Sequence, residues 1–466
     1  MMTNKIKREN GGFFFLLLIR IVYVVTTIKI LDGLWYYGGG YDINFNLQKE
    51  IFALLNKLRT TTDISIVMIS AMTFYFKYNY YANNFKSIVI KVLFTLYYIP
   101  LNASFSIHDQ TVLYFAITNI YFFLLMFFCC KAMRIGTITI STRSEQGFDR
   151  YEKYDQKKLF DLLNRRVVRV VLFSICLLCI AYKISYNGFS FSLNIFGDSV
   201  YTTRESYVET MNTLDSTAIG YIVTLIMNLA GYTVPFYLYL AIRKKDYFAG
   251  FVSIIALLSI FSVNSSKSAM LFVFIVFAIG FLEKNNLLSK FSKYFEVCIF
   301  CVLILSLFTY LIFKRYDFYF LILRREMFLP AWLDTKYYML FENAPKLVWS
   351  QGTFLLQKLI PSIYSTGYLQ MINNNYFGGY VPSPNTGLFA DAYMNFGIIG
   401  IIIYPLLISF VLNKSEGIYR KYGLGIMTVM AVKLAIHLTN VPLLRTDFIL
   451  SYFLFTFILW LVSKVK

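Results

Sequence analysis

The sequence predicts an all-α membrane protein, a polytopic bundle of about 12 transmembrane helices with one long loop on the outer side of the membrane. Of its 466 residues, 58% are hydrophobic and only 15% are charged, and the mean hydropathy is +0.59. The apolar residues fall in long blocks, and about 20 of them cross a hydrocarbon core. Lipid offers the backbone no hydrogen-bond partner, so each block is expected to be helical.

The chain begins with the basic stretch Lys5 to Arg8, followed by an apolar run from Phe13. Because no small-residue cleavage site follows, we interpret this run as an uncleaved first span. The predicted spans cover residues 13–31, 62–78, 87–101, 110–130, 167–186, 214–242, 247–263, 268–283, 294–313, 387–412, 423–438 and 446–463.

The charge distribution predicts an orientation. With the N-terminus inside, the inner segments hold about 26 Lys and Arg and the outer segments about 13, of which 7 lie in the long loop. Cytoplasmic loops carry such an excess of cations, so both termini are expected in the cytoplasm. The same bias explains much of the net charge of +19 without nucleic acid.

The long outer loop runs from about Lys314 to Thr386 and is expected to form a folded cap with short helices. Its cations Arg315, Arg324 and Arg325 suit phosphate oxygens, which guanidinium groups bind bidentately, but solvated surface charge is the alternative. The many aromatic residues in the loop suit either sugar faces or a membrane interface.

A second candidate region reads GGYVPSPNTGLFADAYMNFGIIG, from Gly378 to Gly400. Its carboxylate, Asp391, is expected near the outer end of a span, where a charge is costly unless it is paired or faces a polar cavity. The alternative is a helix N-terminal charge that complements the helix dipole. Tyr393 and Asn395 lie on the same segment and are further candidates.

Other polar residues are expected at outer helix ends. Lys267 begins a span after a short hairpin and could hold an anion at the helix N-terminus, or simply snorkel. His437 and Arg445 flank the end of the eleventh span, and a structural histidine is the alternative. Lys433 is one of several intramembrane cations expected to snorkel from near a span end.

Several functional classes are excluded or disfavoured. The chain has no P-loop, dinucleotide-binding glycine fingerprint or H-E-x-x-H sequence, and no segment resembles a nucleic-acid-binding module. All six cysteines lie inside apolar blocks, so their two C-x-x-C pairs are interpreted as structural rather than as metal or redox sites. We therefore expect no cofactor and no metal.

Three segments resemble the O-antigen polymerase (Wzy) family of oligosaccharide repeat-unit polymerases. They are SSKSAMLFVF (Ser265 to Phe274), RREMFLPAWL (Arg324 to Leu333) and TGLFADAYMNFGIIG (Thr386 to Gly400). The first is similar to a family element that more often carries arginine where this chain has Lys267. The predicted span count and the single large outer loop match the family over nearly the whole chain.

The resemblance implies a glycosyltransferase-C-like fold in the bacterial inner membrane. It also implies that undecaprenyl-pyrophosphate-linked oligosaccharides are joined on the periplasmic face into O-antigen or capsular polysaccharide, with membrane lipid and a chain-length regulator as partners. Arg315, Arg324 and Arg325 are expected to contact the pyrophosphate, with Lys267 and Arg445 as second choices. Asp391 or Glu326 would accept the proton of the acceptor hydroxyl.

Two other functions fit a similar architecture. An O-antigen ligase is expected to use a histidine in the large outer loop, and residues 314–386 contain none. A flippase for lipid-linked oligosaccharides would need no outer loop of that length. Transporters also often show paired halves, and the sequence shows no such halves.

Overall fold

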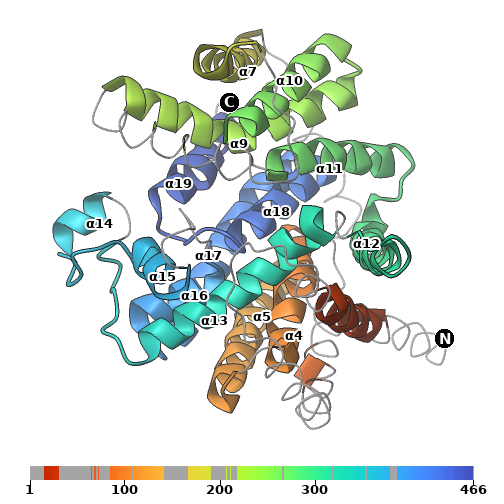
Figure 1. Ribbon diagram of the computed structural model, residues 1–466. Helices are drawn as coiled ribbons and strands as arrows, with labels where there is room; N and C mark the ends of the chain where they lie inside the picture. Colours follow the sequence, from red (N-terminus) through yellow and green to blue (C-terminus); the bar gives the residue numbers. More distant parts are fainter. Residues whose placement is uncertain are drawn as a thin grey trace.

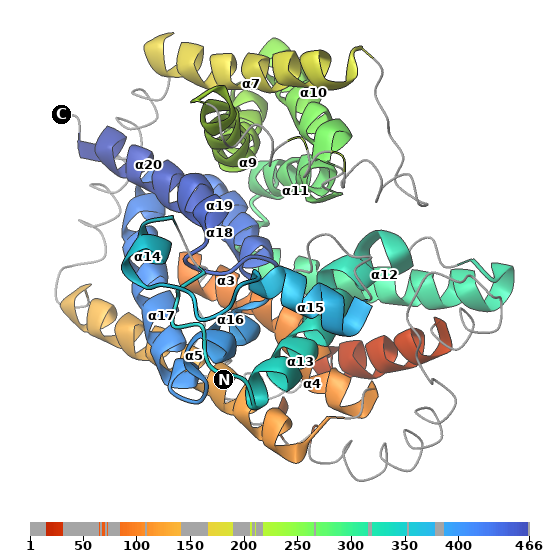
Figure 2. The same cartoon turned by 60° about the vertical axis from the view of Figure 1, so that its left-hand side comes forward.

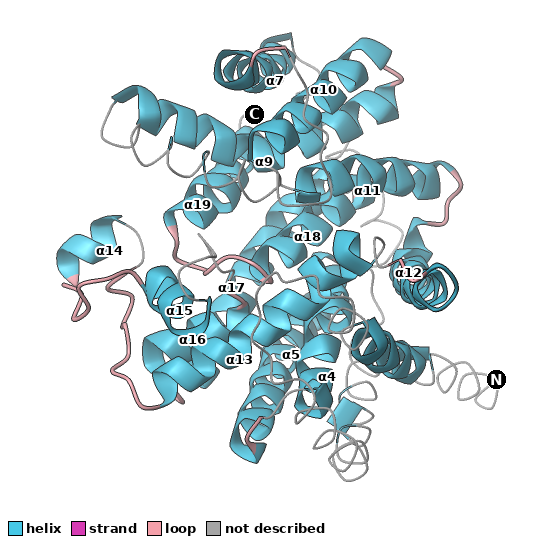
Figure 3. Cartoon of the chain, viewed as in Figure 1, coloured by secondary structure: helices cyan, strands magenta, loops and turns pink. Residues whose placement is uncertain are grey.

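The computed structural model describes residues 15–30, 84–107, 110–140, 166–189, 218–264, 267–315, 319–351, 354–377 and 386–464, together with residues 65, 68, 69, 72, 206 and 210. Every regular element in these residues is helical (Figures 1 and 3). In chain order they are α3 (Phe85–Leu93), η1 (Phe94–Tyr98), α4 (Ile99–Ile107), α5 (Val112–Ile140), α7 (Arg166–Asn187), α9 (Ala218–Lys244), α10 (Tyr247–Asn264), α11 (Lys267–Lys284), η2 (Leu288–Lys290), α12 (Phe291–Phe313), η3 (Tyr319–Phe328), α13 (Leu329–Glu342), α14 (Phe354–Leu359), α15 (Tyr368–Phe377), α16 (Leu388–Phe396), α17 (Gly400–Tyr419), η4 (Arg420–Tyr422), α18 (Leu424–Leu438), α19 (Thr446–Phe448), η5 (Ile449–Phe453) and α20 (Leu454–Lys464).

Seven helices in the described residues are long and apolar enough to cross a membrane. The shorter apolar helices Tyr247–Val263 and Leu424–Leu438 accompany them. On α12, Phe308, Leu311 and Phe313 are exposed, as expected where side chains face lipid rather than water. The fold is therefore a helical membrane bundle. Twelve spans stay a prediction, because the second predicted span, 62–78, lies largely outside the described residues.

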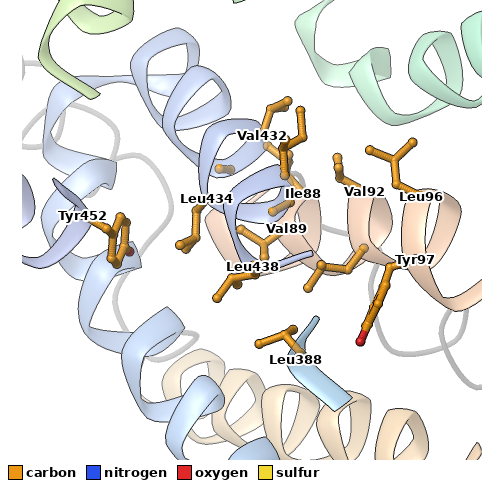
Figure 4. Close-up of a cluster of buried hydrophobic side chains, with 14 of the residues drawn as sticks. Ile88, Val89, Val92, Leu96, Tyr97, Leu388, Val432, Leu434, Leu438 and Tyr452 are labelled. Atoms are coloured by element: carbon orange, nitrogen blue, oxygen red, sulfur yellow. The ribbon is translucent and has the colours of Figure 1, made fainter. Parts of the chain in front are cut away.

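The centre of the bundle is built around the continuous helix α3–η1–α4, which is almost entirely buried. Its branched and aromatic side chains pack against α18, and Figure 4 shows Ile88, Val89 and Val92 with Val432 and Leu438 in this contact. Leu388 from α16 lies beside the same cluster. Burial on every side explains why α18 is apolar on most of its surface, whereas α3–η1–α4 also buries polar residues such as Lys86, Thr95 and Asn102.

Helices α7, α9, α10 and α11 pack on one another in a second group, seen at the top of Figure 2. Helices α9 and α11 also contact α18, and α9 contacts η5. Helix α18 therefore packs against both groups of helices. The polar side chains described below lie on it or around it.

The described part of the long predicted loop contains four helices, η3, α13, α14 and α15. Helix α13 is not a surface cap, because residues Pro330 to Thr335 are buried and the helix packs against α4, α16 and η3 (Figure 1). The expected short helices are present, and α13 is buried because the apolar side chains of AWL and the aromatic residues of KYYMLF draw it into the core.

The predicted span 387–412 is also wrong in one respect, because the chain breaks within it. Helix α16 ends at Phe396 and α17 begins at Gly400. Gly397 between them has φ +58°, a left-handed conformation that glycine adopts without steric cost. The membrane-spanning part starts at Gly400, so Asp391 lies on a short separate helix.

Candidate functional site

A polar stripe interrupts the apolar surface of α18. From Gly425 to Thr439 every residue is buried except Lys433 and His437, which are partly exposed. These two residues are four apart, so they lie on the same face of the helix. Asn440, also partly exposed, follows just beyond the helix end. We call Lys433, His437 and Asn440 the polar stripe.

The inner residue of the polar stripe is Lys433. Its ammonium nitrogen lies 4.4 Å from the ring centroid of Phe272 on α11 and 5.7 Å from that of Tyr232 on α9. Glu326 on η3 lies within electrostatic range of the same group. The expected snorkelling lysine is thus held between aromatic rings of two other helices.

His437 is held by two aromatic residues. Tyr232 Oη and His437 Nδ1 are 2.9 Å apart, and the imidazole packs against Phe448 with ring centroids 4.9 Å apart. Lys433 and Arg445 are both within electrostatic range of this imidazole. His437 is therefore held in a fixed ring orientation within electrostatic range of two cations.

Arg445 joins the last helices to the long loop. Its Nε is 3.3 Å from Asp447 Oδ1, and about a third of each side chain is exposed. The side chain also hydrogen-bonds Tyr368 on α15 and interacts electrostatically with Tyr337 on α13. The neighbouring Asp447 carboxylate is the main cause of the raised pKa of Arg445, so the guanidinium is charged at any physiological pH.

Asp334 is a buried carboxyl that the sequence analysis did not identify as a candidate. It accepts hydrogen bonds from the hydroxyl of Tyr97 and, at 3.1 Å, from the backbone N–H of Gly387. The Tyr97 oxygen in turn accepts the N–H of Phe389 at 3.0 Å. Burial raises the pKa of Asp334 to about 8.

Asp391 is a second buried carboxyl. Its Oδ2 accepts the backbone N–H of Leu443 at 2.7 Å, and its Oδ1 accepts Asn395 Nδ2 at 2.8 Å. Burial raises its pKa to about 7. With only 2% of its surface exposed, Asp391 does not reach a substrate directly in this conformation. Its contact with Leu443 instead fixes the segment that carries Arg445.

Asn395 and Tyr393 connect α16 to the long loop. Asn395 Oδ1 accepts the N–H of Trp349 at 2.8 Å, and the Trp349 indole donates to Tyr404 at 2.6 Å. The ring of Tyr393 lies 4.6 Å from the ammonium of Lys346 and is itself buried. Both residues are therefore packed within the fold and hold α16 against residues 346–349.

The structure brings only part of the predicted site together. His437 belongs to the polar stripe, and Glu326 and Arg445 lie within electrostatic range of its members Lys433 and His437, whereas Arg315 is exposed at the end of α12. Arg324 is partly buried on η3 near Tyr319. The side chains of Lys267 and Arg325 lie outside the described part of the chain, as do residues Gly378 to Asn385.

Sequence reasoning missed Tyr232 and Asp334 and interpreted Lys433 as snorkelling. A lysine on an otherwise apolar helix is a signal that could have been weighted more heavily. Among the described residues, no group of three or more His, Cys, Asp or Glu could hold a metal ion. The C-x-x-C pairs 176/179 and 298/301 lie on the apolar helices α7 and α12.

Comparison with known proteins gives no further assignment. No protein-family model, no curated protein and no solved structure matches this chain.

Proposed function

We propose that this protein is a membrane glycosyltransferase that polymerises undecaprenyl-pyrophosphate-linked oligosaccharide repeats into O-antigen or capsular polysaccharide. The reaction would take place on the periplasmic face of the bacterial inner membrane, with both termini in the cytoplasm. The observation that supports it best is that the three segments resembling the Wzy family meet around α18 and the turn that follows it.

Each segment makes its own contact there. Phe272, from SSKSAMLFVF, lies against Lys433. Glu326, from RREMFLPAWL, is in electrostatic range of the same lysine. Asp391, from TGLFADAYMNFGIIG, binds the backbone of Leu443, two residues before Arg445. Residues from three distant segments thus approach α18 or the turn after it, where the cations Lys433 and Arg445 are carried, and transfer from a diphosphate requires such cations.

The proposed transfer of the donor chain to the acceptor sugar needs no cofactor. A hydroxyl oxygen of the acceptor sugar forms a bond to the anomeric carbon of the donor chain, and the bond from that carbon to the pyrophosphate oxygen breaks. The released pyrophosphate carries the electron pair, and Arg445 stabilises its developing charge. Glu326, whose side chain is also buried in this conformation, is the carboxylate proposed to accept the hydroxyl proton once the bound substrate reaches it. Asp391, being buried, acts as a positioning residue for Arg445.

Two alternatives are separated by simple observations. Loss of a polymerase leaves single repeat units on the cell surface, whereas loss of a ligase or a flippase leaves none. Polymerisation of a lipid-linked repeat by the purified protein would exclude a flippase. His437 lies outside the long loop in which a ligase histidine is expected.

The first test is removal of the Arg445 charge. We expect Arg445→Ala to reduce the polysaccharide ladder to single repeats, because the developing pyrophosphate charge loses its partner, and Arg445→Lys to retain partial activity. The matched control is Arg420→Ala, an exposed arginine before the opposite end of α18. Gel analysis of surface polysaccharide measures the result. An unchanged ladder in the well-expressed Arg445→Ala variant would remove Arg445 from the proposed mechanism.

A further inference from the structure

Lys433 carries a positive charge deep in an apolar helix contact. The described contacts of its ammonium group are with the rings of Phe272 and Tyr232, on two different helices. An aromatic face stabilises an ammonium group through its quadrupole but leaves the net charge in place. An intramembrane cation is costly to retain, and such residues commonly serve binding or transport rather than packing. The part of this charge that the carboxylate of Glu326 does not compensate is therefore available to an anion.

The polar stripe connects this charge with Arg445. Lys433 and His437 lie one turn apart, about 6 Å along the α18 axis, and both are partly exposed while their neighbours on the helix are buried. Arg445 acts on the same imidazole from the side of α19. The two cations thus both act on one histidine. A diphosphate has two charged phosphoryl groups and matches two separated cations better than a monophosphate does.

We propose that Lys433 is a second anion-binding residue, which makes the site selective for a lipid diphosphate over a lipid monophosphate. The inference rests on the proposed function for the identity of the lipid. In it, Arg445 contacts one phosphoryl group and Lys433 the other, with His437 between them. Phe272 and Tyr232 act as positioning residues that hold the ammonium on the polar stripe.

Removing the Glu326 carboxylate tests whether Lys433 binds an anion. Its carboxylate lies within electrostatic range of Lys433 and competes with any incoming anion. If Lys433 pairs with Glu326 but does not reach the lipid headgroup, removal of the carboxylate leaves diphosphate binding unchanged. If Lys433 binds a phosphate, Glu326→Gln strengthens that binding.

The experiment measures binding of polyprenyl diphosphate, polyprenyl monophosphate and inorganic pyrophosphate to the purified full chain in nanodiscs. We expect the wild type to prefer the lipid diphosphate over the monophosphate by about tenfold. Lys433→Met should abolish the preference and Lys433→Arg should keep it. Lys421→Met, which removes an exposed lysine near the other end of α18, is the matched control and should behave as wild type. Tight binding of inorganic pyrophosphate would show that the headgroup alone suffices, and weak binding that the lipid contributes.

Two results would overturn the assignment. One is a wild-type protein without the preference, and the other is a Lys433→Met variant that keeps it. If Lys433→Met does not fold, Glu326→Gln decides, because diphosphate affinity should rise about threefold, and an unchanged or weaker affinity contradicts the proposal. A parallel polymerisation assay separates the two proposals. Binding selectivity without polymerisation refutes the proposed function alone, and polymerisation with selectivity independent of Lys433 refutes the inference alone.

Discussion

At the scale of single residues, two buried carboxyls hold neighbouring segments in place through hydrogen bonds. Asp334 holds Tyr97 and the N-terminal end of α16, and Asp391 holds Leu443. A buried carboxyl without such donors would be strongly destabilising. The hydrogen bonds lower each pKa in part, yet burial dominates and keeps both values near neutrality.

These carboxyls predict how stability depends on pH. Between pH 4 and about 8, folded Asp334 retains a proton that the unfolded chain has lost. Stability therefore falls as pH rises through this window, by up to about 1.4 kcal/mol per pH unit for one group. Asp391 acts in the same direction up to about pH 7. We expect the thermal midpoint in detergent to be lower at pH 8 than at pH 6.

The variant Asp334→Asn tests whether Asp334 causes this dependence of stability on pH. The amide oxygen can still accept from Tyr97, but the group no longer titrates, so the slope of thermal midpoint against pH should become shallower. Glu342→Gln, at the exposed C-terminal end of α13, is the matched control for removal of a carboxyl outside the core. An equal slope in the wild type and Asp334→Asn would assign the pH dependence to other groups.

The sequence predicted part of this residue-level picture. Asp391 was identified because a carboxylate beside an apolar block must be paired, and the structure shows its donors. Asp334 was not identified, because its partner Tyr97 is 237 positions earlier in the chain. No local pattern encodes so distant a pair. Lys433 was recognised as an intramembrane cation, but its aromatic neighbours depend on how α9 and α11 pack.

At the scale of elements, the decisive feature is the break between α16 and α17. Hydropathy could not reveal it, because Phe396 to Gly400 is as apolar as a continuous span. The glycines that cause it were visible in the sequence, but their effect depends on a close approach. A Cβ atom at Gly400 would overlap the carbonyl oxygen of Ala392, so glycine lets α17 begin directly against α16.

Two glycines on α17 give a matched prediction. Gly400→Ala should lower the thermal midpoint and cost about 1–3 kcal/mol, because the backbone of α16 must move. Gly417→Ala meets no atom within 4 Å on the same helix and should be neutral or stabilising by about 0.4–1 kcal/mol. Thermal unfolding of both purified variants measures the difference. Equal midpoints would show that the α16–α17 contact is looser than described.

At the scale of the whole molecule, long-range contacts join segments that the charge pattern places on the same side of the membrane. Thr386 bonds the backbone of Asn440, and Gln110 bonds Thr335, all at predicted outer positions. Lys86 bonds Asn413 at predicted inner positions. Hydropathy thus predicted a helical membrane bundle, and the sides given by the charge pattern stay a prediction with which these contacts agree, whereas the burial of α13 required packing information that sequence periodicity does not contain.

This arrangement predicts which positions an impermeant thiol reagent can reach. In a variant without native cysteines, Lys358→Cys on α14 should be labelled in intact spheroplasts, because the long loop is expected outside. Lys245→Cys, in the exposed turn between α9 and α10, and Lys464→Cys, at the end of α20, should be labelled only after lysis. Denatured protein provides the control for total reactivity. Labelling of Lys245→Cys before lysis would reverse the orientation and place the polar stripe at the cytoplasmic face, where a periplasmic polymerase could not use it.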